Sequence, residues 1–196
     1  MRIVAGRLRR RKLLANPGLI TRPITDRVKE ILFERLGDVI ENARVADVFA
    51  GTGTLGLEAI SRGASRVVFI ESDQKAHELL KENVKKLGVE SETLSWRADV
   101  MRCSYRPKGV TGFLPYDVIF FDPPYRLVPF IQPGDSLYRS LERLGRDDVS
   151  SPDALFVFRT PERAEFSLPE AWKIESALEI SGMTIHLARK RHVDDV

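Results

Sequence analysis

The sequence has 196 residues, of which 43% are hydrophobic and 30% charged, and these proportions are typical of a soluble globular chain. This length suffices for one well-packed domain and is short for two. No apolar run approaches the ~20 residues of a membrane helix. The single cysteine, Cys103, excludes an internal disulfide framework and is typical of a reducing cytoplasm. The histidines His77, His186 and His192 are scattered, so we expect no metal site.

The positive charge is concentrated near the N-terminus. Residues 1–29 carry nine Lys or Arg and one acid, Asp26, whereas the remainder carries 22 basic and 27 acidic residues. A local basic cluster attracts phosphate and releases condensed counterions, which favours nucleic-acid binding. A solvated tail and an organelle transit peptide are the alternatives, although the first 20 residues contain no Ser or Thr. We interpret residues 1–36 as a basic extension with a helix, and residues 37–196 as one domain.

Hydrophobic periodicity and turn residues predict helices and strands that alternate along the chain. We expect helices at 26–36, 54–63, 74–87 and 136–145, and strands at 44–49, 66–70, 93–97, 116–121, 154–159, 172–180 and 183–190. Such alternation predicts a mostly parallel, Rossmann-like α/β sheet covered on both faces. Gly182 separates the last two strands, which read as a hairpin that adds an antiparallel strand at one edge. A ligand of this fold binds beyond the C-terminal ends of the strands.

A glycine-rich turn follows the first strand of the domain. Residues 51–56 (GTGTLG) match G-x-G-x-x-G, and such glycines let the backbone turn tightly and approach a ligand. Glu71 ends the second strand, where a carboxylate can accept hydrogen bonds from a ribose diol. Asp99 follows the third strand, where it is suited to an adenine amino group beside the amide of Val100, although an exposed loop aspartate is the ordinary alternative. Together these features indicate a cofactor that contains adenosine.

Asp47 indicates which cofactor it is. This acid lies four residues before Gly51, at the mouth of a turn where it would repel the pyrophosphate of a dinucleotide. S-adenosylmethionine has no phosphate, and its ammonium group can be attracted by an acid. The alternative is that Asp47 orients loop amides. The predicted S-adenosyl-L-methionine site comprises Asp47, Ala50, Gly51, Thr52, Gly53, Glu71, Ser72, Asp99 and Val100.

The segment Asp122, Pro123, Pro124 and Tyr125 directly follows an apolar strand, and two prolines there make a stiff loop that exposes carbonyl groups. The nitrogen of an exocyclic amine is nearly planar, so attack on a methylsulfonium requires its lone pair to be localised. The Asp122 carboxylate and the Pro123 carbonyl can accept its two hydrogens, and the carboxylate also stabilises the cationic transition state. Tyr125 can stack on a base swung out of its helix. We predict that these four residues form the catalytic site.

With these motifs in hand, the chain resembles the small-subunit (16S) ribosomal RNA guanine-N2 methyltransferase D family. The resemblance covers almost the whole length. It rests on 2–6 (RIVAG), 21–27 (TRPITDR), 47–63, Glu71, 122–125 (DPPY) and 182–184 (GMT). The DPPY segment alone is shared with adenine methylases, whereas TRPITDR is more discriminating.

The resemblance implies a seven-stranded class I methyltransferase fold, S-adenosylmethionine as donor, and a guanine in 16S ribosomal RNA presented in a small-subunit particle. It also implies that residues 21–27 lie near the cofactor and the basic N-terminus near RNA. The predicted RNA contacts are Arg9, Arg10, Arg11, Arg22 and Arg27. The chain departs from the family at two positions, since Arg10 replaces a usual Gly and Arg159 replaces a usual Glu.

The sequence therefore predicts methyl transfer to guanine N2 by a cytoplasmic monomer without a metal or a membrane segment. The motif does not distinguish guanine N2 from adenine N6, because both are exocyclic amines, so a DNA or RNA adenine methylase is one alternative. A non-catalytic RNA-binding assembly factor that retains the fold is the other. The intact Gly51, Gly53, Glu71, Asp122 and Tyr125 favour catalysis.

Overall fold

The structure, a computed structural model, describes residues 1–15 and 24–191. One seven-stranded sheet has the strand order β3-β2-β1-β4-β5-β7-β6. Its strands are β1 (Arg44–Val48), β2 (Arg66–Glu71), β3 (Thr93–Arg97), β4 (Tyr116–Phe121), β5 (Ser150–Pro161), β6 (Trp172–Ile180) and β7 (Met183–Lys190). The first five strands pair in parallel, and β7 pairs antiparallel with both β5 and β6. The predicted class of fold, a mostly parallel sheet with an antiparallel C-terminal hairpin, is confirmed.

The hairpin lies at one edge of the sheet, as predicted. The sequence did not indicate which of its strands is outermost: β7 lies between β5 and β6, and β6 forms the edge. The burial of the two strands explains this order. Most residues of β7 are buried, whereas most of β6 is exposed or half-buried, so the strand with the more buried surface takes the interior place.

Four α-helices lie at the predicted places. They are α1 (Asp26–Leu36), α2 (Thr54–Ser61), α3 (Gln74–Leu87) and α4 (Ser136–Leu144). Thr25 caps α1 by accepting a hydrogen bond from the Val28 amide, and Gly37 follows its end with φ +53°. Three 3₁₀ segments were not predicted, namely η1 (Gly37–Ile40), η2 (Glu90–Glu92) and η3 (Tyr125–Phe130).

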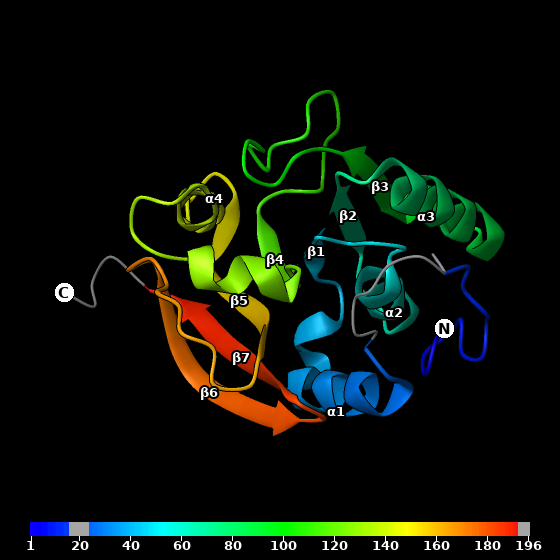
Figure 1. Ribbon diagram of the computed structural model, residues 1–196. Coiled ribbons are helices and arrows are strands. Elements are labelled where there is room, and N and C mark those ends of the chain that lie inside the picture. The colour runs from blue at the N-terminus through cyan, green and yellow to red at the C-terminus, as the bar shows by residue number, and fades with distance from the viewer. Residues whose placement is uncertain (16–23, 192–196) are drawn as a thin grey trace.

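Two hydrophobic clusters cover the two faces of the sheet. Helices α1, α2 and α3 pack on one face, and α4 with η3 packs on the other (Figure 1). Strand β4 shows the alternation, since Val118 and Phe120 belong to the first cluster and Ile119 and Phe121 to the second. The central strands are thus buried on both sides, and a ligand of these strands would bind at their C-terminal ends.

The N-terminal segment is attached to α2. The backbone of Arg2 and Lys12 forms an antiparallel bridge, and the Arg7 amide donates to the Ser61 carbonyl over 2.8 Å. A Cβ atom at Gly6 would lie 1.8 Å from the Ser61 carbonyl oxygen, so only glycine fits this approach. Among the described residues, no helix has the length and apolarity required to span a membrane.

Candidate active site

The turn between β1 and α2 forms the floor of the candidate site. Gly51 and Gly53 have φ values of +56° and +86°, which favour glycine. Gly56 lets α2 pack closely against β2. A Cβ atom at this position would lie 2.3 Å from the Phe69 ring and 2.8 Å from Val67, so a larger residue would not fit. A Cβ at Gly51 would meet no atom within 4 Å, so this part of the turn faces open space. Ala50 and Thr52 lie in the same turn and are nearly buried.

Asp47 lies beneath this turn. Its side chain is almost fully buried, and its Oδ2 accepts a hydrogen bond of 2.8 Å from the Gly56 amide. The contact resembles the alternative reading of Asp47, in which the side chain orients backbone amides, although Gly56 lies in the first turn of α2 rather than in the loop. Burial raises the pKa of the Asp47 carboxyl well above its usual value, and the nearby Asp122 and Glu71 carboxylates raise it further.

Glu71 ends β2 and connects two backbone segments. One carboxylate oxygen accepts from the Gly51 amide over 2.8 Å, and the other accepts from the Asp73 amide over 2.7 Å. A carboxylate has about four acceptor positions, so two remain for a ligand. Ser72, the next residue, is exposed. This pair of bonds fixes the carboxylate beside the glycine turn.

Asp99 and Val100 follow β3 and differ in exposure. The Asp99 side chain is 55% exposed, and it accepts a hydrogen bond from the Met101 amide over 2.9 Å. Val100 is buried, and its carbonyl accepts from the Ser140 hydroxyl over 2.9 Å. The Arg143 guanidinium donates to the Met101 carbonyl over 2.8 Å. Helix α4 therefore holds the loop that carries Asp99 and Val100.

Asp122 follows β4 and is paired with Arg159 of β5. The guanidinium donates from Nε to Oδ1 over 2.5 Å and from Nη2 to Oδ2 over 2.8 Å, a bidentate pair. The Arg159 side chain is 10% exposed and that of Asp122 is 19% exposed. Burial raises the pKa of the Asp122 carboxyl above its usual value, and the Arg159 charge opposes this rise.

The remaining motif residues surround this ion pair. Pro123 is buried, and Pro124 and Tyr125 are half-buried. Tyr125 begins η3, and the Arg159 guanidinium carbon lies 5.6 Å from the centroid of its ring. The segment predicted as a loop therefore turns into a short 3₁₀ helix directly after the two prolines. Arg159 thus contacts both the ring of Tyr125, the first residue of this helix, and the carboxylate of Asp122.

The strand order brings together residues predicted to bind the donor and residues predicted to be catalytic. Strand β1 lies between β2 and β4, so the ends that carry Glu71 and Asp122 flank the end of β1. The Asp122 amide donates to the Val48 carbonyl over 3.2 Å and ties the DPPY segment to β1. The carboxylates of Asp47, Glu71 and Asp122 thus lie at the C-terminal ends of three adjacent strands, β1, β2 and β4.

Most of the predicted RNA contacts lie on the N-terminal part. Arg9, Arg10, Arg11 and Arg27 are exposed. Arg10 has φ +67°, a conformation that favours the glycine usual at this position. Arg11 donates to the Lys86 carbonyl over 3.1 Å and so rests on α3. The prediction for Arg22 lies outside the described residues.

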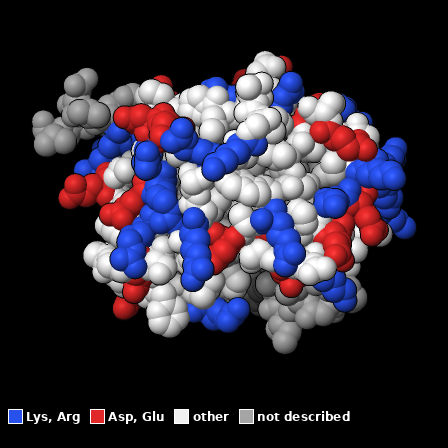
Figure 2. Space-filling view, turned by 90° about the horizontal axis from the view of Figure 1, so that it is seen from above, with Lys and Arg blue, Asp and Glu red and all other residues white. Residues whose placement is uncertain are grey.

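The surface charge is mixed on the face that is seen from above in the orientation of Figure 1. Figure 2 shows Lys and Arg in several groups, with Asp and Glu between them. A broad positive field is therefore absent from the described residues on that face, and RNA contact would depend on particular side chains.

Two structural features were missed by the sequence analysis. Glu58 is fully buried in α2, and its carboxylate accepts from the Val4 and Ala5 amides over 2.9 and 3.0 Å. Lys29, also fully buried, lies 3.4 Å from the same carboxylate. The sequence offered one signal for this pair, a Glu within the apolar run of α2. Ionised side chains are seldom buried without a partner, so such a Glu indicates a buried basic or amide partner.

Asn83 is a further residue that sequence reasoning missed. Its side-chain amide, buried on α3, donates to the Thr52 carbonyl over 3.0 Å and to the Leu14 carbonyl over 3.0 Å. It thus joins the glycine turn to the N-terminal segment. Nothing in the helical pattern around Asn83 distinguished it from other polar residues.

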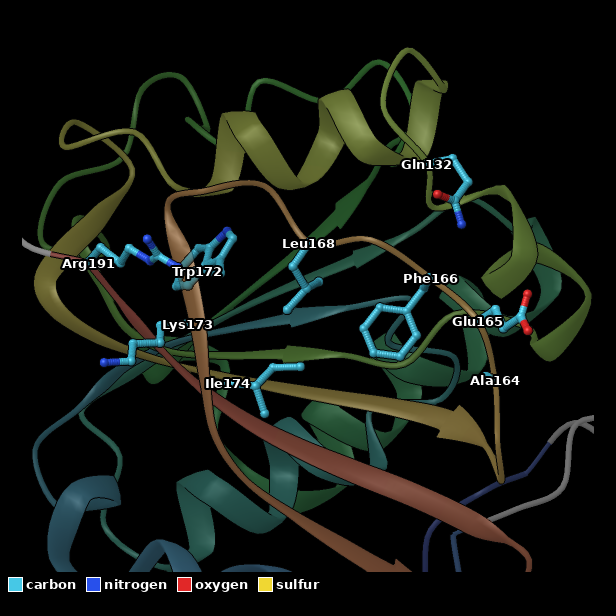
Figure 3. Close-up of a pocket in the computed structure, with 9 residues that line it drawn as sticks. All are labelled: Gln132, Ala164, Glu165, Phe166, Leu168, Trp172, Lys173, Ile174 and Arg191. Atoms are coloured by element: carbon cyan, nitrogen blue, oxygen red, sulfur yellow. The ribbon is translucent and has the colours of Figure 1, made fainter. Parts of the chain in front are cut away.

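A separate hollow of about 550 Å³ lies beside the edge strand β6. Its lining includes Phe166, Leu168, Trp172 and Ile174, and none of the predicted site residues contributes to it (Figure 3). The hollow is therefore separate from the carboxylates at the strand ends.

Comparison with known proteins agrees with the fold. The family described as "Conserved hypothetical protein 95" matches residues 1–187. The chain is similar to the ribosomal RNA small subunit methyltransferase D of Haemophilus influenzae, with 35% identity over 181 residues that cover 89% of this chain and 86% of that protein. A solved Escherichia coli structure described as a putative methyltransferase is 31% identical, with a TM-score of 0.79 and coverage of 97% and 98% of the two chains.

A more distant neighbour shows the same fold. It is an RNA methyltransferase from Salinibacter ruber, solved in complex with S-adenosyl-L-homocysteine, with 18% identity and a TM-score of 0.63 over 87% of this chain and 94% of that one. The seven-stranded sheet is therefore that of the class I methyltransferases.

Proposed function

Because the chain belongs to the small-subunit ribosomal RNA methyltransferase D family, we propose that it transfers a methyl group from S-adenosylmethionine to the N2 amino group of a guanine in 16S ribosomal RNA. The observation that carries this proposal is the position of Asp122. It directly follows β4, next to the end of β1 that leads into the glycine turn, and its carboxylate is close enough to that of Asp47 to raise the pKa of Asp47.

The described residues fit the cofactor. The turn at Gly51 borders open space, and the Glu71 carboxylate beside it keeps acceptor positions for ribose hydroxyls. Asp47 adds negative charge suited to an ammonium group and unsuited to a pyrophosphate. S-adenosylmethionine supplies an electrophilic methyl group bound to sulfonium. Asp99 and Val100 would hold its adenine.

The catalytic residues bind and orient the amino group. The Asp122 carboxylate and the Pro123 carbonyl accept its two hydrogens, which localises the nitrogen lone pair and aims it at the methyl group. As the nitrogen becomes cationic, the Asp122 carboxylate stabilises the developing charge. Tyr125 stacks on the base, and such stacking is worth ~1–3 kcal/mol per base in single-strand binding. This offsets part of the few kcal/mol that base flipping costs.

The rest of the proposal concerns the substrate particle. The exposed arginines Arg9, Arg10 and Arg11 would contact phosphate groups of a small-subunit particle, and Arg22 and Arg27 would extend this contact toward the cofactor. The chain would act as a monomer, with residues 1–36 as the RNA-binding extension and residues 37–196 as the methyltransferase domain.

Radiolabelled methyl transfer followed by nucleoside analysis tests the proposal. The substrates are small-subunit particles that lack the modification, naked 16S RNA and DNA, each offered to the wild type and to Asp122→Ala. Labelled N2-methylguanosine from the particles is the expected result. Labelled N6-methyladenosine would keep the donor and the amino-group chemistry but overturn the guanine. Transfer to DNA alone would overturn the ribosomal substrate.

Donor binding measured in the same preparations tests the non-catalytic alternative. An assembly factor would bind the particles and transfer no label to any of the three substrates.

A further inference from the structure

Arg159 is the group in the site to which neither the family motif nor the mechanism above gives a role. It lies at the end of β5, where β5 pairs with β4, and Phe158 is in register with Phe121. The following residues, Arg159 and Asp122, are therefore neighbours across the two strands. Both nitrogen–oxygen contacts of the pair are short, 2.5 and 2.8 Å, and each comes from a different nitrogen of the guanidinium.

We propose that Arg159 is a positioning residue for methyl transfer, whose guanidinium fixes the plane of the Asp122 carboxylate and keeps it ionised while the outward acceptor positions of its oxygens bind the target amino group. This inference rests on the proposed function, because it assigns a role to a neighbour of the same carboxylate.

The geometry leaves room for both partners of Asp122. Two planar groups joined by two parallel hydrogen bonds are held in one orientation, whereas a single bond would let the carboxylate rotate. A carboxylate has about four acceptor positions, and Arg159 takes two of them. The other two remain available to an amino group. The ion pair therefore orients Asp122 without removing it from the reaction.

Packing also fixes the guanidinium. The Arg159 side chain is 10% exposed, its Nη1 lies 3.9 Å from the Met183 sulfur of β7, and its carbon lies 5.6 Å from the Tyr125 ring centroid. An arginine held on three sides loses little further freedom when it binds a carboxylate. The same contact links Tyr125, the proposed base-stacking residue, to the position of Asp122.

The electrostatic surroundings explain why Asp122 requires a cation. Asp47 from β1 is a like charge near Asp122, and Glu71 from β2 is a further like charge near Asp47. Among the salt bridges of residues 1–15 and 24–191, Arg159 is the one basic residue that pairs with any of these three acids. His186 of β7 lies on the other face, against Phe158 and Phe166. Burial raises the pKa of the Asp122 carboxyl and so favours its protonated form, and Arg159 opposes this rise.

Three variants separate this role from a structural one. Arg159→Gln removes the charge, Arg159→Lys keeps the charge without the fork, and Arg189→Gln is a matched control on β7. Arg189 is a partly exposed arginine that lies 3.4 Å from Glu175. Thermal unfolding and donor binding by calorimetry are measured for each variant, together with the pH dependence of kcat on the substrate that the wild type labels.

For Arg159→Gln we expect kcat to fall about 10²-fold while donor affinity changes less than about threefold. The acidic limb of the kcat profile should move up by about one pH unit or more, because the active form of Asp122 is ionised and loss of the cation raises its pKa. Arg159→Lys should lower kcat about tenfold, with its acidic limb near that of the wild type. Arg189→Gln should match the wild type.

Infrared spectroscopy gives a readout that needs no substrate. The band of a protonated Asp122 carboxyl, identified by its loss in Asp122→Asn, should appear at higher pH in Arg159→Gln than in the wild type. If the wild type labels no nucleic acid, the proposed function fails on that result alone, and the infrared comparison still tests Arg159.

Two results would overturn the inference. One is an unchanged kcat profile and unchanged infrared titration in a folded Arg159→Gln. The other is loss of donor binding together with activity, which would assign Arg159 to folding or to the donor site. If Arg159→Gln does not fold, Arg159→Lys tests the inference instead. Wild-type kcat in that variant would show that the bidentate guanidinium contact is not needed, and would overturn the inference.

Discussion

The donor end and the methyl-transfer end of the site hold their carboxylates in different ways. Asp47 and Glu71 accept hydrogen bonds from backbone amides, those of Gly56, Gly51 and Asp73. Asp122 is instead held by a side chain, the guanidinium of Arg159, which is 37 positions away in sequence. Backbone amides of packed segments hold these two carboxylates in fixed positions. In the proposed mechanism, the side-chain partner orients the carboxylate that would meet the substrate and opposes the rise of its pKa.

The largest effect should come from removing the carboxylate at the methyl-transfer end. Asp122→Ala should lower methyl transfer by about 10³-fold, because it removes both an acceptor for the amino group and the charge that stabilises the transition state. Donor affinity should stay within a few fold, since the donor end is held by amides. Steady-state kinetics and calorimetry measure the two quantities. Asp148→Ala, which removes a surface carboxylate paired with Arg106 and Arg146, is the control. Wild-type turnover in Asp122→Ala would refute the mechanism.

The opposite pattern is expected at the donor end. Glu71→Gln replaces one of the two acceptor oxygens with an NH₂ donor. The remaining oxygen cannot accept from both backbone amides and from a ribose diol, so donor affinity should fall about 10–100-fold. At saturating donor, kcat should change only a few fold. Calorimetry and kinetics at high donor concentration test this. The exposed Glu78→Gln on α3 should leave both values unchanged. A fall in kcat without a change in donor affinity would contradict the division of the site into two ends.

Asp47→Asn should raise stability while it weakens donor binding. Burial raises the pKa of Asp47 in the folded state, so the stability it contributes is present below its unfolded pKa and is lost as pH rises through the folded value. An asparagine oxygen can still accept from Gly56 and carries no charge. At pH 8 the variant should therefore be about 1 kcal/mol more stable, or more, and near pH 4 the two proteins should be similar. Denaturant unfolding at the two pH values measures this, and a less stable variant at pH 8 would contradict it.

The smallest effect concerns RNA binding away from both ends. Replacing Arg9, Arg10 and Arg11 with Ala should flatten the salt dependence of RNA affinity by about 0.7 in log–log slope for each lost phosphate contact on single-stranded RNA. Catalysis at saturating substrate should persist. Binding is measured from low to high salt, with Arg106→Ala as a control at a surface ion pair. An unchanged slope would show that these arginines make no phosphate contacts with the RNA.

Much of the fold followed from local pattern. The segments predicted for α1 and α3 agree with the observed helices because both have a cap, an apolar face and a closing glycine, Gly37 and Gly88. The short 3₁₀ helix at Tyr125–Phe130 was missed, since it contains Pro129 and has too few residues for a period to be visible. The order of β7 and β6 within the hairpin was not predicted, because the order of strands depends on burial against other elements.

By itself, the sequence determined the class of fold and the two motifs that form the site. Alternating strands and helices, the glycine turn at 51–56 and the segment 122–125 are local, and their chemistry follows from residue type and spacing. Only the tertiary structure decided which partner each carboxylate has. Arg159 looked like a departure at the end of an apolar strand, and it became the partner of Asp122 only because β4 and β5 lie in parallel register. Pairings of this kind join residues far apart in the chain, so they are fixed by packing rather than by local sequence.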